Sequence, residues 1–178
     1  IAGSPETDPQ VTEKIKLWNR QGGTIIAYKN GNNWLKKNKL ADIEYIPSAE
    51  SKLKEGIYAN RSVNIQAQQI PGSIFEVRLD LTHPLCYGYS RDILPVMKTG
   101  ISAVKKVTDI YANPAVFTTE PLLSGYCTKE NIDRLKGCSF VSVHQKRIIS
   151  IYDNTNFRAT WYGTNKIFLN AVFFGQLL

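Results

Sequence analysis

The N-terminal part of the chain alternates between helical and strand-like spacing of hydrophobic side chains. Apolar residues recur every three or four positions behind Thr7-Asp8-Pro9, where a capping residue precedes a proline, and this pattern predicts a helix that ends at Gly22-Gly23. The elements expected here are that helix, a buried strand at 24–28 and a second helix at 32–38 with Trp34 and Leu35 facing inward. A helix–strand–helix order is typical of an α/β sheet.

The middle of the chain changes character. Residues 41–72 are polar and weakly periodic, so we expect a long loop or insertion there, with a short helix at 49–53. Strict alternation then predicts a half-buried strand at 74–80 with Phe75, Val77 and Leu79 on its inner side. The other elements expected in this part are a loop at 83–89, strands at 94–98 and 104–111, and a capped helix at 128–135 that ends at Gly137.

The C-terminal part joins a hairpin, a polar turn and an apolar helix. Strands are expected at 140–144 and 147–152, around a tight turn at Gln145-Lys146. From about Thr160, hydrophobic residues recur at helical spacing with few polar interruptions, so we expect a helix buried on most sides. Gly175 would end it as a C′ residue.

Length and composition favour one globular domain. The chain has 178 residues, of which 43% are hydrophobic, enough for a sizeable core. No run of about eighteen apolar residues is free of charge, and no basic, apolar leader opens the sequence at Ile1. We therefore expect no membrane span, and a chain that is a processed product, a cut fragment or the C-terminal part of a longer protein.

Charge and cysteines exclude several classes of protein. The net charge of +7 comes from scattered lysines and arginines rather than from a basic run interleaved with aromatics, so we expect no nucleic-acid partner. Cys86, Cys127 and Cys138 are odd in number and lack C-x-x-C spacing. They predict free thiols rather than a disulfide scaffold or a structural zinc site.

An ordered set of short segments resembles a known family. The segments are P-G-S-I-F-E-V at 71–77, L-T-H-P-L at 81–85, Y-G-Y at 87–89, L-P-V-M-K-T-G at 94–100, P-L-L-S-G-Y at 121–126 and N-F-R-A-T-W-Y-G-T-N at 156–165. Together they resemble the glutamine amidotransferase-like C-terminal domain of secreted bacterial zinc carboxypeptidases of the carboxypeptidase A-like family. The resemblance implies one α/β domain over residues 1–178, a flavodoxin-like, class I glutamine amidotransferase-like three-layer sandwich.

The resemblance also implies partners and a location. The partner would be the chain's own upstream peptidase domain, and the location would be secreted, periplasmic or at the cell envelope. Family members carry a strand–helix–strand unit before the strand that corresponds to 24–28, and this chain has only residues 1–4 and one helix there. Either the first strands are missing or the sheet is smaller, and we expect an exposed edge or face that favours a homodimer.

The residues expected to catalyse an amidotransferase reaction are absent. The family's G-x-C-x-G elbow corresponds to residues 27–31, which places Lys29 where the nucleophilic cysteine would stand. The H-x-E segment corresponds to 152–156, which contains no histidine. Neither His83 nor His144 begins an H-x-x-E zinc motif or lies in the context of a serine triad. We expect no enzymatic activity and no cofactor in this chain; any zinc would belong to the upstream peptidase domain.

Polar residues at two strand ends remain as binding candidates. They are Lys29 at the elbow, and Asn154, Asn156 and Arg158 in the turn after the last strand. An arginine with amides can hold a carboxylate or a sugar, and the same side chains can equally serve as turn caps and internal pairs. The leading hypothesis is a non-catalytic accessory domain. The alternatives are a binding module for a small anion or saccharide, and a residual enzyme that uses this polar turn.

Overall fold

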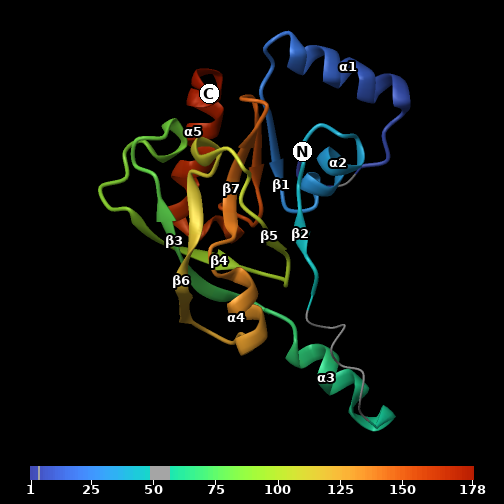
Figure 1. Cartoon of the computed structure of the whole chain (residues 1–178), viewed down its shortest axis with the longest axis vertical. Helices are drawn as coiled ribbons and strands as arrows, with labels where there is room; N and C mark the ends of the chain where they lie inside the picture. The colour runs from blue at the N-terminus through green and yellow to red at the C-terminus, as the bar shows by residue number, and fades with distance from the viewer. Residues whose placement is uncertain (4, 49–56) are drawn as a thin grey trace.

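The computed structural model describes residues 1–3, 5–48 and 57–178 and shows a mixed α/β fold (Figure 1). The main sheet has six strands in the order β1-β8-β7-β6-β3-β4, and β2 pairs with β5 apart from it. The strands are β1 (Ile25–Tyr28), β2 (Tyr45–Ile46), β3 (Ser73–Leu79), β4 (Ile93–Lys98), β5 (Ala103–Val104), β6 (Ala115–Ser124), β7 (Ser139–His144) and β8 (Ile148–Ile151). The β1–β8 pair is parallel, and the other neighbours in the main sheet are antiparallel.

Helices cover both faces of the β1–β8 part of the sheet. The α-helices are α1 (Pro9–Arg20), α2 (Gly31–Lys37), α3 (Arg61–Ala67), α4 (Lys129–Leu135) and α5 (Asn165–Phe174). Side chains of β8 alternate between the two sides: Ile149 packs in one hydrophobic cluster with Ile167 of α5, and Ile148 packs in another with Trp34 of α2. In Figure 1, α3 extends away from the sheet and α1 lies at the opposite end of the molecule.

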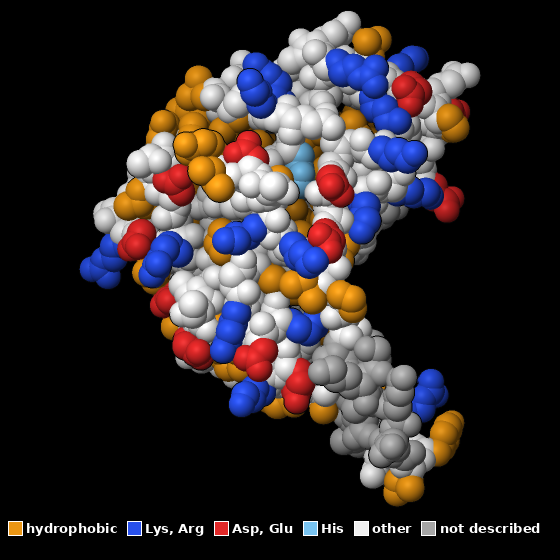
Figure 2. Space-filling view, in the orientation of Figure 1, with side chains coloured by type: hydrophobic (Ala, Val, Ile, Leu, Met, Phe, Trp, Pro, Cys, Tyr) orange, Lys and Arg blue, Asp and Glu red, His pale blue; other side chains and the backbone are white. Residues whose placement is uncertain are grey.

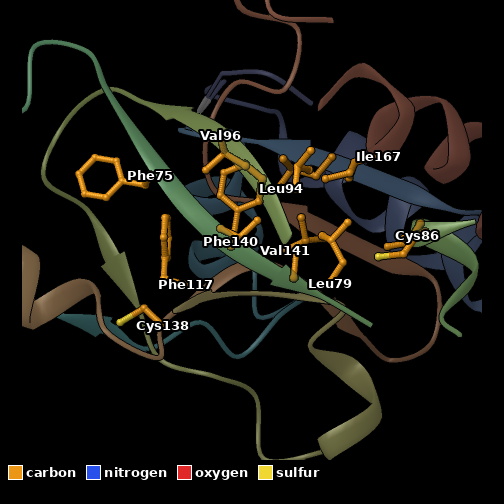
Figure 3. Packing of buried hydrophobic residues seen from close by; sticks show 14 of the residues in the cluster. Phe75, Leu79, Cys86, Leu94, Val96, Phe117, Cys138, Phe140, Val141 and Ile167 are labelled. Carbon is orange, nitrogen blue, oxygen red and sulfur yellow. The ribbon is translucent and has the colours of Figure 1, made fainter. Parts of the chain in front are cut away.

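The larger hydrophobic cluster joins the antiparallel strands to α5. Figure 3 shows Phe75, Phe117 and Phe140 close together, one from each of β3, β6 and β7. Their rings meet edge to face, with centroids 6.0 Å apart for the first two and 5.8 Å apart for the last two. Such pairs add to the stabilisation that burial of the rings provides.

The sheet curls, so that its far edge returns toward its parallel edge. Strands β7, β6 and β3 separate β8 from β4 in the sheet order. Nevertheless, the backbone N–H of Thr99, which follows β4, donates to the carboxylate of Asp153 after β8 at 3.1 Å. The curl therefore brings the ends of β1, β8 and β4 to one place.

Several predicted elements are confirmed. Asp8 caps α1 by accepting from the N–H of Gln10, and Thr128 caps α4 by accepting from the N–H of Asn131. Gln145 and Lys146 form the β7–β8 turn with positive φ at both positions, as in a type I′ hairpin turn. All three cysteines are free thiols.

Other predicted elements are wrong. Residues 104–111 form no continuous strand, because β5 ends at Val104 and a 3-10 turn occupies 110–112. The ten-residue strand β6 was not predicted, since Pro121 and its threonines hide the alternation. The insertion at 41–72 contains β2 and α3. The helix expected at 49–53 lies outside the described residues.

The last helix is shorter and more exposed than expected. It begins at Asn165 after two 3-10 turns, and its outer face leaves Leu169, Val172 and Phe173 exposed. Gly175 does not adopt the left-handed conformation of a C′ residue. A Cβ there would lie 2.9 Å from the side chain of Thr24 and 3.3 Å from that of Ile149 in β8, so close packing against these side chains explains the glycine.

The outer edge of β1 is not open along its whole length. The N-terminal amine of Ile1 donates to the carbonyl of Ile26 at 2.7 Å, and Tyr28 N–H donates to the carbonyl of Ile1 at 2.8 Å. The carbonyl oxygen of Ile1 would lie only 2.1 Å from a Cβ at position 31. Gly31, which has no Cβ, therefore allows this close approach. A homodimer through this edge stays a prediction.

Candidate functional site

A strained turn lies between β1 and α2. Lys29 follows the last residue of β1 and has a φ of 40°, a conformation that non-glycine residues rarely adopt. Its N–H donates to the carbonyl of Ile151, and the side-chain amide of Asn32 donates to the carbonyls of both Lys29 and Ile151. These bonds hold the elbow against the end of β8 and direct the Lys29 side chain along the carboxyl edge of the sheet. Strain of this kind is often found at functional sites.

Two lysines share one buried carboxylate beside the elbow. Lys29 Nζ lies 3.5 Å from Oδ1 of Asp153, and Lys98 Nζ lies 3.4 Å from its Oδ2. The side chains of Lys98 and Asp153 are each only 2% exposed, whereas that of Lys29 is 39% exposed. We call Lys29, Lys98 and Asp153 the ion cluster.

Backbone groups complete the coordination of the carboxylate. The N–H groups of Thr99 and Asn154 donate to the two oxygens of Asp153 at 3.1 and 2.9 Å. Lys29 Nζ also donates to the hydroxyl of Thr99 at 2.5 Å. Burial lowers the pKa of Lys98, and the neighbouring Asp153 opposes part of that shift. The cluster therefore combines a buried pair, whose partners compensate each other, with a third charge that faces solvent.

A polar cavity of about 540 Å³ opens beside the ion cluster, at the carboxyl ends of β1 and β8. Its lining is mostly amides, hydroxyls and phenols, and Lys29 is the one charged residue among the described residues that line it. The residues that line this strand-end cavity are Ala2, Lys29, Asn30, Asn33, Tyr45, Gln69, Thr99, Gly100, Ile101, Ser102 and Tyr152. Ligands of open α/β sheets collect at such strand ends.

Only one of the four candidate residues lines this cavity. Lys29 lies in its wall. Asn154 instead accepts from the N–H of Asn156 at 2.9 Å, which closes a local turn. Asn156 Oδ1 lies 3.5 Å from the Thr155 hydroxyl, and Arg158 is exposed with its guanidinium over the ring of Phe157 at 5.1 Å. In this turn only Asn154 caps a backbone N–H, the Asn156 amide faces the Thr155 hydroxyl, and no contact is found between Arg158 and the ion cluster.

Sequence reasoning missed Lys98 and Thr99. Lys98 had a signal, because it occupies the same face of its strand as Leu94 and Val96, where an inward lysine needs a buried partner. The identity of that partner had no local signal, since Asp153 lies 55 residues further along the chain.

No three histidine, cysteine, aspartate or glutamate side chains gather into a group that could hold a metal ion in the described part of the chain. Within the same ranges, none of the helices has the length and apolar character needed to cross a membrane.

Comparison of the chain with protein-family models, with curated proteins and with solved structures gave no match.

Proposed function

We propose that this chain is a non-catalytic binding domain whose strand-end cavity takes a small hydroxylated carboxylate, such as a sugar acid. The observation that carries the proposal is the partly exposed Lys29 ammonium in the cavity wall. The carboxylate beside it, that of Asp153, is shared with the Lys98 ammonium, so one negative charge faces two positive charges. Because the described lining holds no acidic side chain, an anion can approach Lys29 without repulsion from the wall.

The rest of the lining favours a ligand with several hydroxyl groups. Asn30, Asn33 and Ser102 offer side-chain donors and acceptors, and Tyr45 offers an aromatic ring. Burial raises the pKa of Tyr45, which keeps its phenol neutral and able to donate. Polar groups that fix orientation within a cavity of this size are typical of small-molecule sites.

No histidine that could act as a base lies among the described residues that line the strand-end cavity, which favours binding over catalysis there. At the elbow, Lys29 Nζ lies 3.5 Å from Oδ1 of Asp153 and donates to the hydroxyl of Thr99, so the side chain acts as an ion-pair partner and hydrogen-bond donor. His144, at the other end of β8, and His83 line a different cavity. Release of ammonia from glutamine by the purified chain would contradict this part of the proposal.

The test uses two sugars that differ only at C6, where glucuronate has a carboxylate and glucose has a hydroxymethyl group. Glucuronate and glucose are titrated into the wild-type chain and into Lys29→Met, with binding followed by calorimetry or by amide chemical shifts. We expect glucuronate to bind wild type at least about tenfold more tightly than glucose, as a partly buried charge-assisted hydrogen bond implies, and Lys29→Met to abolish the difference.

Lys37→Met is the matched control, since Lys37 is an exposed lysine of α2 outside the cavity lining. It should leave both affinities unchanged. Equal binding of the two sugars to wild type, or an equal loss in Lys29→Met and Lys37→Met, would overturn the proposal.

The fine classification and the biological setting remain part of the proposal. A flavodoxin-like, amidotransferase-like origin is supported by the strand–elbow–helix arrangement at Lys29 and by the short segments that resemble that family. An accessory role beside an upstream zinc carboxypeptidase domain, in a secreted or cell-envelope protein, rests on that resemblance alone. The residues encoded upstream of Ile1 test it, because an H-x-x-E motif behind a signal peptide is expected there.

A further inference from the structure

A second cavity, also of about 540 Å³, lies at the hairpin end of β7 and β8. Apolar side chains form most of its wall. The residues that line this hairpin-end cavity are Asp42, His83, Pro84, Val107, Asp109, Tyr111, Ala112, Val143, His144, Gln145, Lys146, Leu177 and Leu178. Figure 2 shows a histidine in a hollow of this face, with acidic and hydrophobic side chains beside it. We infer that this cavity is a binding site for a small, uncharged, mainly apolar molecule that carries a carbonyl or ether oxygen.

The first step concerns a buried hydrogen-bond network behind the cavity wall. The hydroxyl oxygens of Ser142 and Tyr152 lie 2.6 Å apart, and the Ser142 hydroxyl lies 2.9 Å from Nε2 of His144. Tyr152 and His144 are each 6% exposed, and Ser142 is fully buried. A buried phenol must donate its proton, because an unsatisfied donor there is costly.

The direction of the network follows from that requirement. Burial raises the pKa of Tyr152 to about 12, so the phenol keeps its proton and donates it to Ser142. Ser142 accepts that hydrogen bond and donates its own hydroxyl proton to Nε2 of His144. Burial also lowers the pKa of His144, which is therefore neutral near pH 7 and carries its single proton on Nδ1.

The Nδ1–H of His144 is a donor available to the cavity. No described residue makes a hydrogen bond to this nitrogen, while the side chain itself forms part of the cavity wall. His83 repeats the arrangement: its Nδ1 accepts from the N–H of Leu85 at 3.1 Å, and burial lowers its pKa, so its proton lies on Nε2. Two neutral imidazole donors in an apolar wall favour a ligand that accepts hydrogen bonds.

Charged residues at the rim of the hairpin-end cavity indicate whether the hydrogen-bond acceptor of the ligand is neutral or anionic. Asp42 and Asp109 are exposed at the edge of the cavity, and Lys146 is the one cation among the described lining residues. The rim is thus net negative and repels carboxylates, while a neutral carbonyl or ether is not affected. An apolar body fits Val107, Val143 and the other aliphatic side chains.

The first measurement tests the donor directly in the wild-type chain. Histidine side-chain ¹⁵N chemical shifts distinguish a neutral imidazole protonated on Nδ1 from one protonated on Nε2. We expect the Nδ1–H form for His144 and the Nε2–H form for His83 at pH 7.5. An Nε2–H form of His144 would remove the donor from the cavity and overturn the inference.

The second measurement compares three probes with the same phenyl body: acetophenone, benzoate and benzylamine. Amide chemical shifts report binding, and shifts at Val143, His144 and Leu178 locate it. Acetophenone should bind there, and both other probes should bind roughly tenfold more weakly or not at all. The net negative rim repels benzoate, whereas the ammonium of benzylamine offers no acceptor to the imidazole donors. Benzoate or benzylamine binding as tightly as acetophenone, or no shift at these residues with any probe, would contradict the proposed ligand class.

A matched pair of variants separates the donor from the fold. His144→Asn keeps an N–H close to the position of Nδ1, and His144→Leu removes it while retaining an apolar side chain. Acetophenone should bind His144→Leu about three- to tenfold more weakly than wild type, the range for one neutral hydrogen bond, and His144→Asn within about threefold. Equal affinity for all three would show that the imidazole contributes no hydrogen bond. If either variant does not fold, the ¹⁵N assignment and the probe series on wild type still decide.

Discussion

The two cavities at opposite ends of β8 have the same volume but opposite chemistry. The strand-end cavity is polar and has the Lys29 ammonium in its wall, whereas the hairpin-end cavity is mainly apolar and has neutral imidazoles in its wall. Behind the first lies a buried ion pair, and behind the second lies a neutral chain of hydrogen bonds. Polar groups are thus buried as a charged pair near one end of β8 and as a neutral hydrogen-bond network near the other.

The difference shows which cost each arrangement has to offset. Lys98 and Asp153 stabilise each other only as long as both are present, because either charge alone would lie buried without a partner. Ser142, His144 and Tyr152 avoid the cost of burying charge by remaining neutral. The charged arrangement is therefore the more sensitive to loss of one member, and the neutral arrangement is the more sensitive to pH near 6.

Tyr152 connects the two regions. It follows β8 directly, its side chain lines the strand-end cavity, and its hydroxyl belongs to the network behind the hairpin-end cavity. Substitutions on either side of Tyr152 test whether the two regions are independent.

The largest expected effect comes from breaking the buried Lys98–Asp153 ion pair behind the strand-end cavity. Asp153→Asn leaves the buried Lys98 ammonium without a carboxylate and should lower the free energy of unfolding by about 3–5 kcal/mol in urea denaturation at pH 7. The double variant Asp153→Asn/Lys98→Met should recover part of that loss, since the unpaired charge is removed. A double variant less stable than Asp153→Asn alone would contradict this account of the pair.

The next effect is the pH dependence of stability that His144 contributes through the neutral network behind the hairpin-end cavity. The pKa of His144 is lowered mainly by burial, with Asp42 opposing part of the shift, so the unfolded chain binds a proton more readily than the folded chain. The stabilisation is complete above the ordinary pKa of about 6.5 and is lost as pH falls below it, by at most about 1.4 kcal/mol per pH unit. Denaturation of wild type and His144→Leu from pH 7.5 to 5 measures it. The slope should be smaller in the variant, where His83 still contributes with the same sign.

A smaller effect tests whether the regions are independent. Tyr152→Phe removes the phenol that donates to Ser142 and should cost about 1–2 kcal/mol, the range for one buried hydrogen bond. Because the ring remains in the strand-end cavity, glucuronate affinity should stay unchanged within about twofold. A tenfold loss of that affinity would show that the two cavities are coupled through this residue.

The smallest expected effect concerns the elbow. Lys29→Gly and Lys29→Ala both remove the ammonium, but only glycine adopts a positive φ without strain. The glycine variant should be more stable than the alanine variant by about 0.5–1 kcal/mol in thermal or urea denaturation. A more stable alanine variant would mean that the backbone at position 29 is not strained.

Much of the local structure could be predicted from sequence, because each signal lay within a few residues. Asp8 capped α1 as expected, and Gln145-Lys146 closed the expected hairpin. Failures occurred where local signals were weak or misleading, as with β6, whose polar residues and Pro121 obscured a ten-residue strand. The apolar α5 was expected to be buried on most sides, yet it covers only one face of the sheet and exposes Phe173.

The sequence by itself determined the helix–strand–helix order of the N-terminal part, the β7–β8 hairpin and the position of Lys29 directly after β1. Only the tertiary structure decided what those residues face. The curl of the sheet, set by the packing of side chains far apart in the chain, brought Lys98 and Thr99 to Asp153. The register of β7 on β8 likewise placed Ser142 and His144 within reach of Tyr152. Contacts of this kind depend on long-range packing, which local periodicity does not encode.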